Sequence, residues 1–173
     1  MDTFFEQIIP IKKTSKEWLK LVGIWALAFI LIFLVANFLF FTPLMSIAIL
    51  LCIGICYGAY KLSTRLSIEY EYIITNGTFD VDKIIARSSR KRELSFDISG
   101  VERLEKYNPA SHPVGNFKKT VIACNPTDPN AYFAVVSEDG KGSRLLVFSP
   151  DERIRGAFVK ALPKFIANSA FKD

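Results

Sequence analysis

The residues best suited to chemistry are few in this sequence, and none stands in a spacing that supports catalysis. His112 is the single histidine and lies beside Pro113 in an irregular stretch, where we expect it to be solvated. The sequence contains no phosphate-binding P-loop and no GxGxxG, GxSxG, HExxH or CxxC motif. We therefore predict a protein that is not an enzyme and holds no cofactor.

Carboxylates offer the next candidates for acid–base or metal chemistry. Asp80 and Asp82 alternate with Phe79 and Val81, which is the pattern of a strand with one solvated face. Asp97 lies farther along the chain. We expect Asp80 and Asp82 to be solvated, and we expect none of the three carboxylates to have a catalytic or metal-binding role.

The three cysteines, Cys52, Cys56 and Cys124, show no paired spacing. This pattern predicts neither a disulfide framework nor a zinc site. An odd number of cysteines suits a reducing compartment.

A cluster of cations is the most distinctive polar feature. It consists of Arg87, Arg90, Lys91 and Arg92, which we expect at a β-turn. Each cation close to an anionic lipid surface contributes about 1 kcal/mol, so contact with anionic lipid is one interpretation of this cluster. A solvated turn is the alternative.

An uncharged stretch divides the chain. Between Lys20 and Lys61 there is no Asp, Glu, Lys, Arg or His. The apolar runs at about 20–41 and 44–61 are long enough to cross a bilayer as helices, and a Thr-Pro pair separates them. We predict a transmembrane helical hairpin within residues 15–62. A cleaved signal peptide and a buried soluble hairpin are the alternatives, and the length and all-round apolarity of the runs disfavour both.

The residues that flank this hairpin predict where it begins and how it is oriented. Thr14 and Glu17 have the spacing of a capping box, so the first helix should begin near Ser15. Six basic residues flank the two runs: Lys12, Lys13, Lys16, Lys20, Lys61 and Arg65. The positive-inside rule then predicts a multi-pass protein of the plasma membrane with both termini in the cytoplasm.

Small and polar residues within the spans suggest how helices pack. Gly54 and Gly58 form a GxxxG spacing, which allows close packing either within the hairpin or between two copies. Asn37 is expected to form an interhelical hydrogen bond or to lie near the membrane interface.

Residues 1–14 are predicted to be an N-terminal interfacial segment. Their apolar residues form a short amphipathic turn that Pro10 ends. We expect this turn to lie in the membrane interface or to dock on the folded domain.

From residue 66 the pattern becomes that of β-strands. Residues 66–75 and 78–86 flank Asn76-Gly77, a strong hairpin signal. Five further β-rich runs follow, at 93–96, 100–107, 118–124, 131–137 and 143–149. We therefore predict about seven antiparallel strands in a cytoplasmic domain that covers residues 66–168.

A C-terminal helix is predicted over residues 151–167. Ser149 is the expected cap, and apolar residues recur at helical spacing from Ile154 onward. Pro163 interrupts this stripe, so we expect a kink or an early end near Ala161.

Seven strands followed by an amphipathic helix is the plan of the pleckstrin-homology (PH) superfold. The chain resembles bacterial PH-like domain proteins, in which a membrane hairpin precedes a strand reading Tyr-x-Ile-Thr-x-Gly, here Tyr72 to Gly77. MDTFFEQI, the hairpin and EYEYIITNGTFDVDKII together also resemble an uncharacterised family of small Gram-positive membrane proteins with a domain of unknown function. The resemblance implies an α+β membrane protein with a transmembrane hairpin, a PH-like β-barrel or sandwich, and a C-terminal helix.

The resemblance also bears on ligands. Phosphoinositide-binding PH domains carry Lys and Arg around the first hairpin loop, whereas this loop is the Asn76-Gly77 turn. We therefore do not expect inositide headgroups to bind in that manner.

Taken together, these features predict a non-enzymatic, membrane-tethered interaction or scaffolding module at the inner face of the membrane. Its partners would be the bilayer and a protein, or a second copy of the chain. The modest net charge of +5 fits a membrane surface better than nucleic acid. One alternative is an accessory subunit of a membrane enzyme or transporter. Another is a small-molecule or lipid-binding protein that uses the barrel mouth, between residues 107–116 and 125–130.

Overall fold

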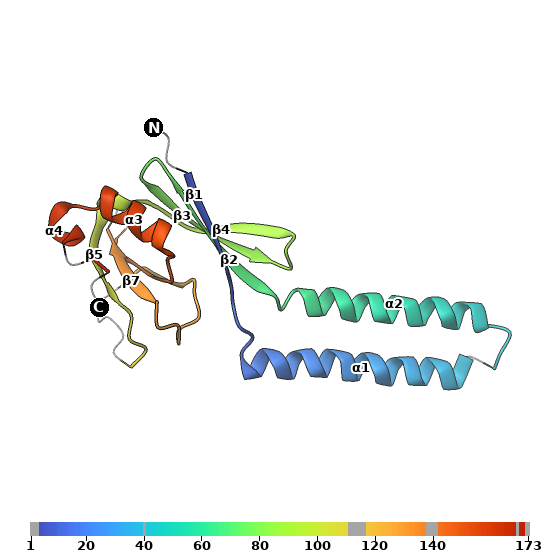
Figure 1. Cartoon of the computed structure of the whole chain (residues 1–173). Helices are drawn as coiled ribbons and strands as arrows, with labels where there is room; N and C mark the ends of the chain where they lie inside the picture. Colours follow the sequence, from blue (N-terminus) through green and yellow to red (C-terminus); the bar gives the residue numbers. More distant parts are fainter. Residues whose placement is uncertain (1–3, 40, 111–116, 138–141, 169, 172–173) are drawn as a thin grey trace. The chain divides into compact units, whose positions relative to one another are not determined.

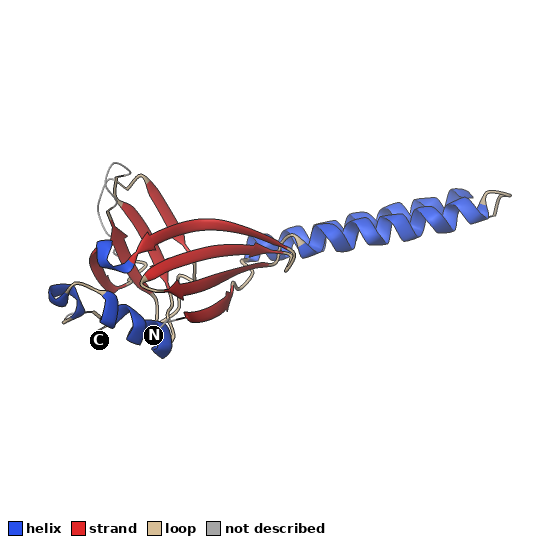
Figure 2. Cartoon of the chain, turned by 90° about the horizontal axis from the view of Figure 1, so that it is seen from above, coloured by secondary structure: helices blue, strands red, loops and turns tan. Residues whose placement is uncertain are grey.

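The computed structural model describes residues 4–39, 41–110, 117–137, 142–168 and 170–171. The chain divides into two compact units. One contains residues 1–11, 69–84 and 88–173, and the other contains residues 12–68 and 85–87. Figures 1 and 2 show this division: the second unit holds two long helices, and the first holds paired strands and the C-terminal helices. His112, predicted to be solvated, lies outside the described residues.

The helical unit is an antiparallel pair, α1 (Ser15–Leu39) and α2 (Met45–Thr64), whose helices lie side by side (Figure 1). Small residues allow the close packing, because the buried positions are Ala28 of α1 and Ala48 and Ala59 of α2. Most other large apolar side chains of the pair are exposed. Both helices are long and apolar enough to cross a membrane.

The predicted capping box is confirmed. The Thr14 backbone N–H donates to Glu17 Oε2 over 2.7 Å, and the Glu17 N–H donates to Thr14 Oγ1 over 3.4 Å. The expectation of an interhelical bond for Asn37 is wrong. Its Nδ2 donates to the carbonyl of Phe33, one turn earlier in the same helix, over 2.8 Å.

The first sheet has the strand order β1-β2-β3-β4. Its strands are β1 (Phe4–Pro10), β2 (Ile68–Thr75), β3 (Thr78–Ile85) and β4 (Ser89–Asp97). Residues 4–10 form a strand, so the prediction of a short amphipathic turn is wrong, whereas one of its two expected placements, docking on the folded domain, agrees with the pairing of β1 with β2. β1 pairs antiparallel with β2, from Phe4 opposite Thr75 to Pro10 opposite Glu69. The two long helices are thus an insertion between two neighbouring strands of one sheet.

The second sheet has the strand order β5-β7-β8-β6. Its strands are β5 (Val101–Lys106), β6 (Lys119–Ile122), β7 (Tyr132–Val136) and β8 (Arg144–Phe148). β6 runs parallel to β8, whereas the other two pairings are antiparallel. β2 to β8 are the seven strands predicted within residues 66–168, and β1, which lies before that range, adds an eighth described strand. The prediction that all strands are antiparallel is wrong, because β6 pairs in parallel with β8.

Both sheets contribute to the main hydrophobic core. Tyr72, Phe79 and Phe148 are fully buried there, and Phe158 of the C-terminal helix packs on Phe79 with ring centroids 4.9 Å apart. That helix, α3 (Glu152–Ala161), ends where Pro163 predicted, and a short helix α4 (Lys164–Ala167) follows. The two helices close the core with their apolar residues Ile154, Phe158, Leu162 and Ile166.

The predicted cap of this helix was wrong by two residues. Asp151 caps α3, since its Oδ1 accepts from the N–H of Ile154 over 2.8 Å. Ser149 instead donates its hydroxyl to Asp128 Oδ2 over 2.8 Å.

A second apolar cluster covers the other face of the second sheet. It consists of Tyr107, Cys124, Ala131, Phe133, Val135, Leu145 and Val147, with Phe117 packed against it. Strands β7 and β8 are therefore buried on both faces, which explains their nearly unbroken apolar sequences.

Candidate functional site

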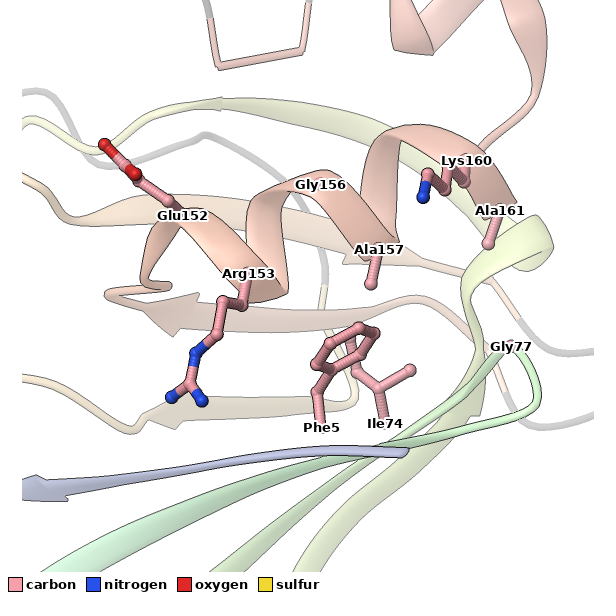
Figure 3. A pocket seen from close by; sticks show the side chains of 9 residues that line it. All are labelled: Phe5, Ile74, Gly77, Glu152, Arg153, Gly156, Ala157, Lys160 and Ala161. Carbon is pink, nitrogen blue, oxygen red and sulfur yellow. The ribbon is translucent and has the colours of Figure 1, made fainter. Parts of the chain in front are cut away.

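A groove between the first sheet and α3 is the candidate site (Figure 3). It has a volume of about 410 Å³. Phe5 of β1 and Ile74 of β2, which lie opposite each other in the sheet, form its floor, and Ala157 and Ala161 of α3 form its upper wall. The interior of the groove is therefore apolar.

Polar residues of α3 stand at the rim of this groove. Arg153 extends from the helix toward the strands, Lys160 lies one to two turns farther along, and Glu152 points away (Figure 3). Arg153 is already paired, because its Nη2 lies 3.0 Å from Asp151 Oδ2. A ligand that suits this groove would be mainly apolar and would carry a negative group near Lys160.

Gln7 connects strand β1 to the start of helix α3, the two elements on either side of the groove. Its Nε2 donates to the carbonyl of Ser149 over 3.2 Å, and its Oε1 accepts from the N–H of Asp151 over 2.9 Å. Because Asp151 also caps α3, these bonds hold the start of the helix against β1. The two walls of the groove are thus joined by hydrogen bonds.

The β1 strand also presents an edge. It is the terminal strand of its sheet, so no described strand pairs with its other side. On the face opposite Phe5 and Ile9, Phe4 is 62% exposed and Ile8 is 48% exposed. Long edge strands that display apolar side chains are sites where another chain can pair.

The predicted cationic cluster is not confined to a turn. Arg87 lies in the β3–β4 turn, but Arg90, Lys91 and Arg92 belong to strand β4. Arg90 Nη1 lies 2.8 Å from Glu71 Oε2, and Arg92 Nη2 lies 3.1 Å from Asp80 Oδ2. The Nε of Arg92 also donates to Asp82 Oδ1 over 3.0 Å, while Lys91 is 3.8 Å from Glu93. Carboxylates of the same sheet therefore neutralise much of the charge on β4.

The acids on this face are less solvated than predicted. Glu71 is completely buried and Asp82 is 8% exposed, so the expectation of a solvated face is wrong for Asp82. Burial, and then the Glu6 carboxyl, raise the pKa of Glu71, while the Arg90 charge opposes this rise. A carboxyl group close to a second carboxyl group keeps its proton to a higher pH, because two neighbouring negative charges repel each other.

The remaining reactive groups and hollows of the described residues include a buried thiol and an open surface hollow. Cys124 is buried, and its burial followed by the charge of Asp128 raises its pKa to about 12. No group of three or more His, Cys, Asp or Glu side chains among the described residues could hold a metal ion. An open hollow of about 540 Å³ lies between residues 106–109 and 126–129, near the predicted barrel mouth, and three of its eight lining residues are prolines.

Gly54 and Gly58 do not lie in the contact surface between α1 and α2. A Cβ added at either position would meet no atom within 4 Å, so neither glycine is needed for α1 to approach α2. Association of two copies through this face stays a prediction.

A comparison with family models covers both the strands and the helix pair. The model described as "Bacterial PH-like domain (DUF6106)" matches residues 1–168. The chain belongs to this family. The match begins before β1 and includes the helix pair, so the inserted helices are part of this PH-like domain. Searches of curated proteins and of solved structures found no significant match.

Sequence reasoning missed the groove of the PH-like domain. Phe5 was predicted to lie in a short amphipathic turn, and no role was predicted for Arg153 or Lys160. The available signal was Phe4-Phe5-Glu6-Gln7-Ile8-Ile9 itself, a run of β-prone residues that Pro10 ends. Its partner strand lies more than fifty residues away in sequence, so no local pattern connects the two.

Proposed function

We propose that this bacterial PH-like domain is a non-enzymatic interaction module anchored in the plasma membrane and presented on its cytoplasmic side. The observation that carries the proposal is the insertion of two exposed apolar helices between the paired strands β1 and β2.

Lipid is the solvent that suits these helices. Their apolar side chains are mostly exposed, as in Phe29 and Leu50. A cleaved leader would remove β1 from the sheet, which argues against α1 as a signal sequence. A helix pair from the core of a soluble protein would instead be mostly buried.

The insertion supports one orientation. Since β1 and β2 are hydrogen-bonded neighbours, the chain leaves the sheet and returns to it on the same side of the membrane. The basic residues at both ends of the helix pair favour the cytoplasmic side. Only residues 11–14 and 65–67 connect the helices to the strands, so the module is tethered closely.

Binding is the activity that the folded unit supports best. Its one buried thiol is kept protonated, and its buried carboxyl Glu71 is engaged by Arg90. A groove and an unpaired edge, in contrast, are features that recognise other chains.

Lipid contact is a second part of the proposal. Arg87 belongs to the same compact unit as the helices, where the N–H of neighbouring Ala86 donates to the carbonyl of Ser67 over 3.0 Å. Within the predicted cluster we therefore expect Arg87 and the 73% exposed Lys91 to contribute most to contact with anionic headgroups. Arg90 and Arg92 would first have to leave their carboxylates.

Photo-crosslinking in intact cells tests this function. We would place a photoreactive amino acid at Lys160 in the folded unit or at Leu50 in α2 of the full-length chain. The proposal predicts that position 160 forms adducts with protein. It predicts that position 50 forms adducts with lipid and with no protein. Adducts from position 50 with a membrane enzyme or transporter would instead favour the accessory-subunit alternative. An absence of protein adducts from the folded unit would contradict the proposal.

A further inference from the structure

We propose that the free edge of β1 and the groove beside it together bind one extended, acidic segment of a partner protein, which adds to the first sheet as a fifth strand. This inference rests on the proposed function and names the surface and the chemistry of the partner.

The edge of β1 supplies the main-chain part of the site. Residues 4–9 are paired with β2 on one side only, so their outward N–H and C=O groups are available to another strand. The free edge ends at Pro10, which has no N–H and whose carbonyl accepts from Asn125 Nδ2 over 3.3 Å. β4, the other edge of this sheet, carries Arg90, Lys91 and Arg92, charges of the kind that discourage pairing. β1 carries one charge, Glu6.

An added strand would cover apolar surface on both faces of the sheet. On one face, its side chains would lie beside Phe4 and Ile8, which are exposed in the unbound chain. On the other face, they would enter the groove between Phe5 and Ala157. A single strand has alternating side chains, so it fits both surfaces at once.

Charge at the groove favours an acidic residue in that strand. The rim of the groove holds Arg153 and Lys160 against one acid, Glu152, and Figure 3 shows Glu152 pointing away. Since Arg153 is paired with Asp151, Lys160 is the main cation for an incoming carboxylate. The segment should therefore place an Asp or Glu on its groove-facing side.

A second copy of the chain fits this surface less well. In the β1 strand of that copy, Phe5 and Ile9 already pack into its own core and could not fill the groove. Antiparallel pairing of two β1 strands would also bring their Glu6 residues together on the face that already holds Glu71. A separate segment with free side chains has neither problem.

Gly156 provides a direct way to block the groove. A Cβ at this position meets no atom within 4 Å, so Gly156→Leu should fold and should fill the space where a ligand side chain would lie. Gly156→Ala is the matched control, because it leaves most of that space open. Lys160→Glu tests the charge, and Lys164→Glu in α4, outside the groove lining, is its control.

The experiment uses a displayed library of random short peptides, selected on the full-length chain in lipid nanodiscs against empty nanodiscs. We expect enriched peptides with alternating apolar residues and an acid. Lys160→Glu should weaken their binding by about five- to tenfold, and Gly156→Leu should abolish it. Lys164→Glu should bind like the wild type, and Gly156→Ala, which adds only a Cβ, should weaken binding much less than Gly156→Leu. Hydrogen exchange of residues 4–9 should slow when the peptide binds.

Three outcomes would overturn the inference. They are a lack of enrichment, enriched peptides whose binding survives Gly156→Leu, and dimerisation of the chain that Gly156→Leu prevents. In the second case, protein adducts from the folded unit would still support an interaction module, so the failure of this inference would be distinct from the failure of the proposed function.

Discussion

The two sheets share one core but differ in their outer faces. The outer face of the second sheet is covered by the apolar cluster around Phe133 and Val147, which leaves β7 and β8 buried on both faces. The outer face of the first sheet carries Glu71, Asp82 and the arginines of β4, and its β1 edge is unpaired. In our proposal, the second sheet mainly stabilises the fold, whereas the first sheet carries the inserted helix pair and the binding surface.

The largest expected loss of stability comes from a substitution on the covered face of the second sheet. Phe133→Ala should lower the free energy of unfolding by about 3–5 kcal/mol, because it empties a buried site beneath Arg103, whose guanidinium lies 5.2 Å from the ring. A truncation on the outer face of the first sheet, Ile73→Ala, should lower the free energy of unfolding by only about 1 kcal/mol, since Ile73 is already partly exposed. Pulse proteolysis of the full chain in detergent would measure both. Equal losses would contradict the proposed difference between the sheets.

Removal of Arg90 should have the next largest effect. Arg90→Ala leaves the buried Glu71 without its cation and should cost about 1–3 kcal/mol at neutral pH. Lys91→Ala is the matched control and should change stability by less than about 0.5 kcal/mol, because this side chain is exposed and 3.8 Å from Glu93. If the two variants unfold at the same urea concentration, the Arg90–Glu71 contact contributes nothing to stability.

The pH dependence of stability should show the raised pKa of Glu71. Folding then favours the protonated carboxyl, so its contribution is complete below the ordinary value of 4.5 and is lost as pH rises through the raised pKa. Glu71→Gln stays neutral at every pH. Relative to this variant, the wild type should lose stability as the pH rises above 4.5. A difference that is constant with pH, or that grows in the opposite direction, would show that the pKa of Glu71 is not raised.

The smallest effect concerns the turns of the first sheet. Asn76 and Gly77, with φ of 50° and 90°, are residues that suit a left-handed turn, whereas Ala86 and Arg87 adopt φ of 56° and 54° without that advantage. Replacing Ala86-Arg87 by Asn-Gly should stabilise the chain by about 1 kcal/mol. Urea unfolding would detect this gain. A loss of stability would mean that the Arg87 side chain contributes more than the strained turn costs.

Local signals predicted most of the fold correctly. The Asn76-Gly77 hairpin, the Thr14–Glu17 capping box and the end of α3 before Pro163 each depend on a few adjacent residues. The apolar runs likewise predicted two helices of spanning length. The family resemblance, based on Tyr72 to Gly77, was confirmed by the match over residues 1–168.

The errors arose where distant residues decide the structure. β1 finds its partner only across the helix pair, and β6 pairs in parallel with β8, so neither follows from local pattern. The strand pattern placed Asp82 on an outer face correctly, but it could not reveal that the face would be covered. The groove could not be predicted for the same reason, because Phe5 and Lys160 line one cavity only in the folded chain.

Cysteine accessibility in whole cells tests the central proposal most directly. Single cysteines would be placed at Thr42 in the turn between the helices, at Lys13 before α1 and at Lys160 in α3, in a full-length chain whose three native cysteines are replaced by serine. A membrane-impermeant maleimide added outside the cells should label position 42. It should label positions 13 and 160 only after the cells are permeabilised. Labelling of 13 and 160 in intact cells, or of only one of them, would contradict a helix pair that enters and leaves the membrane from the cytoplasmic side.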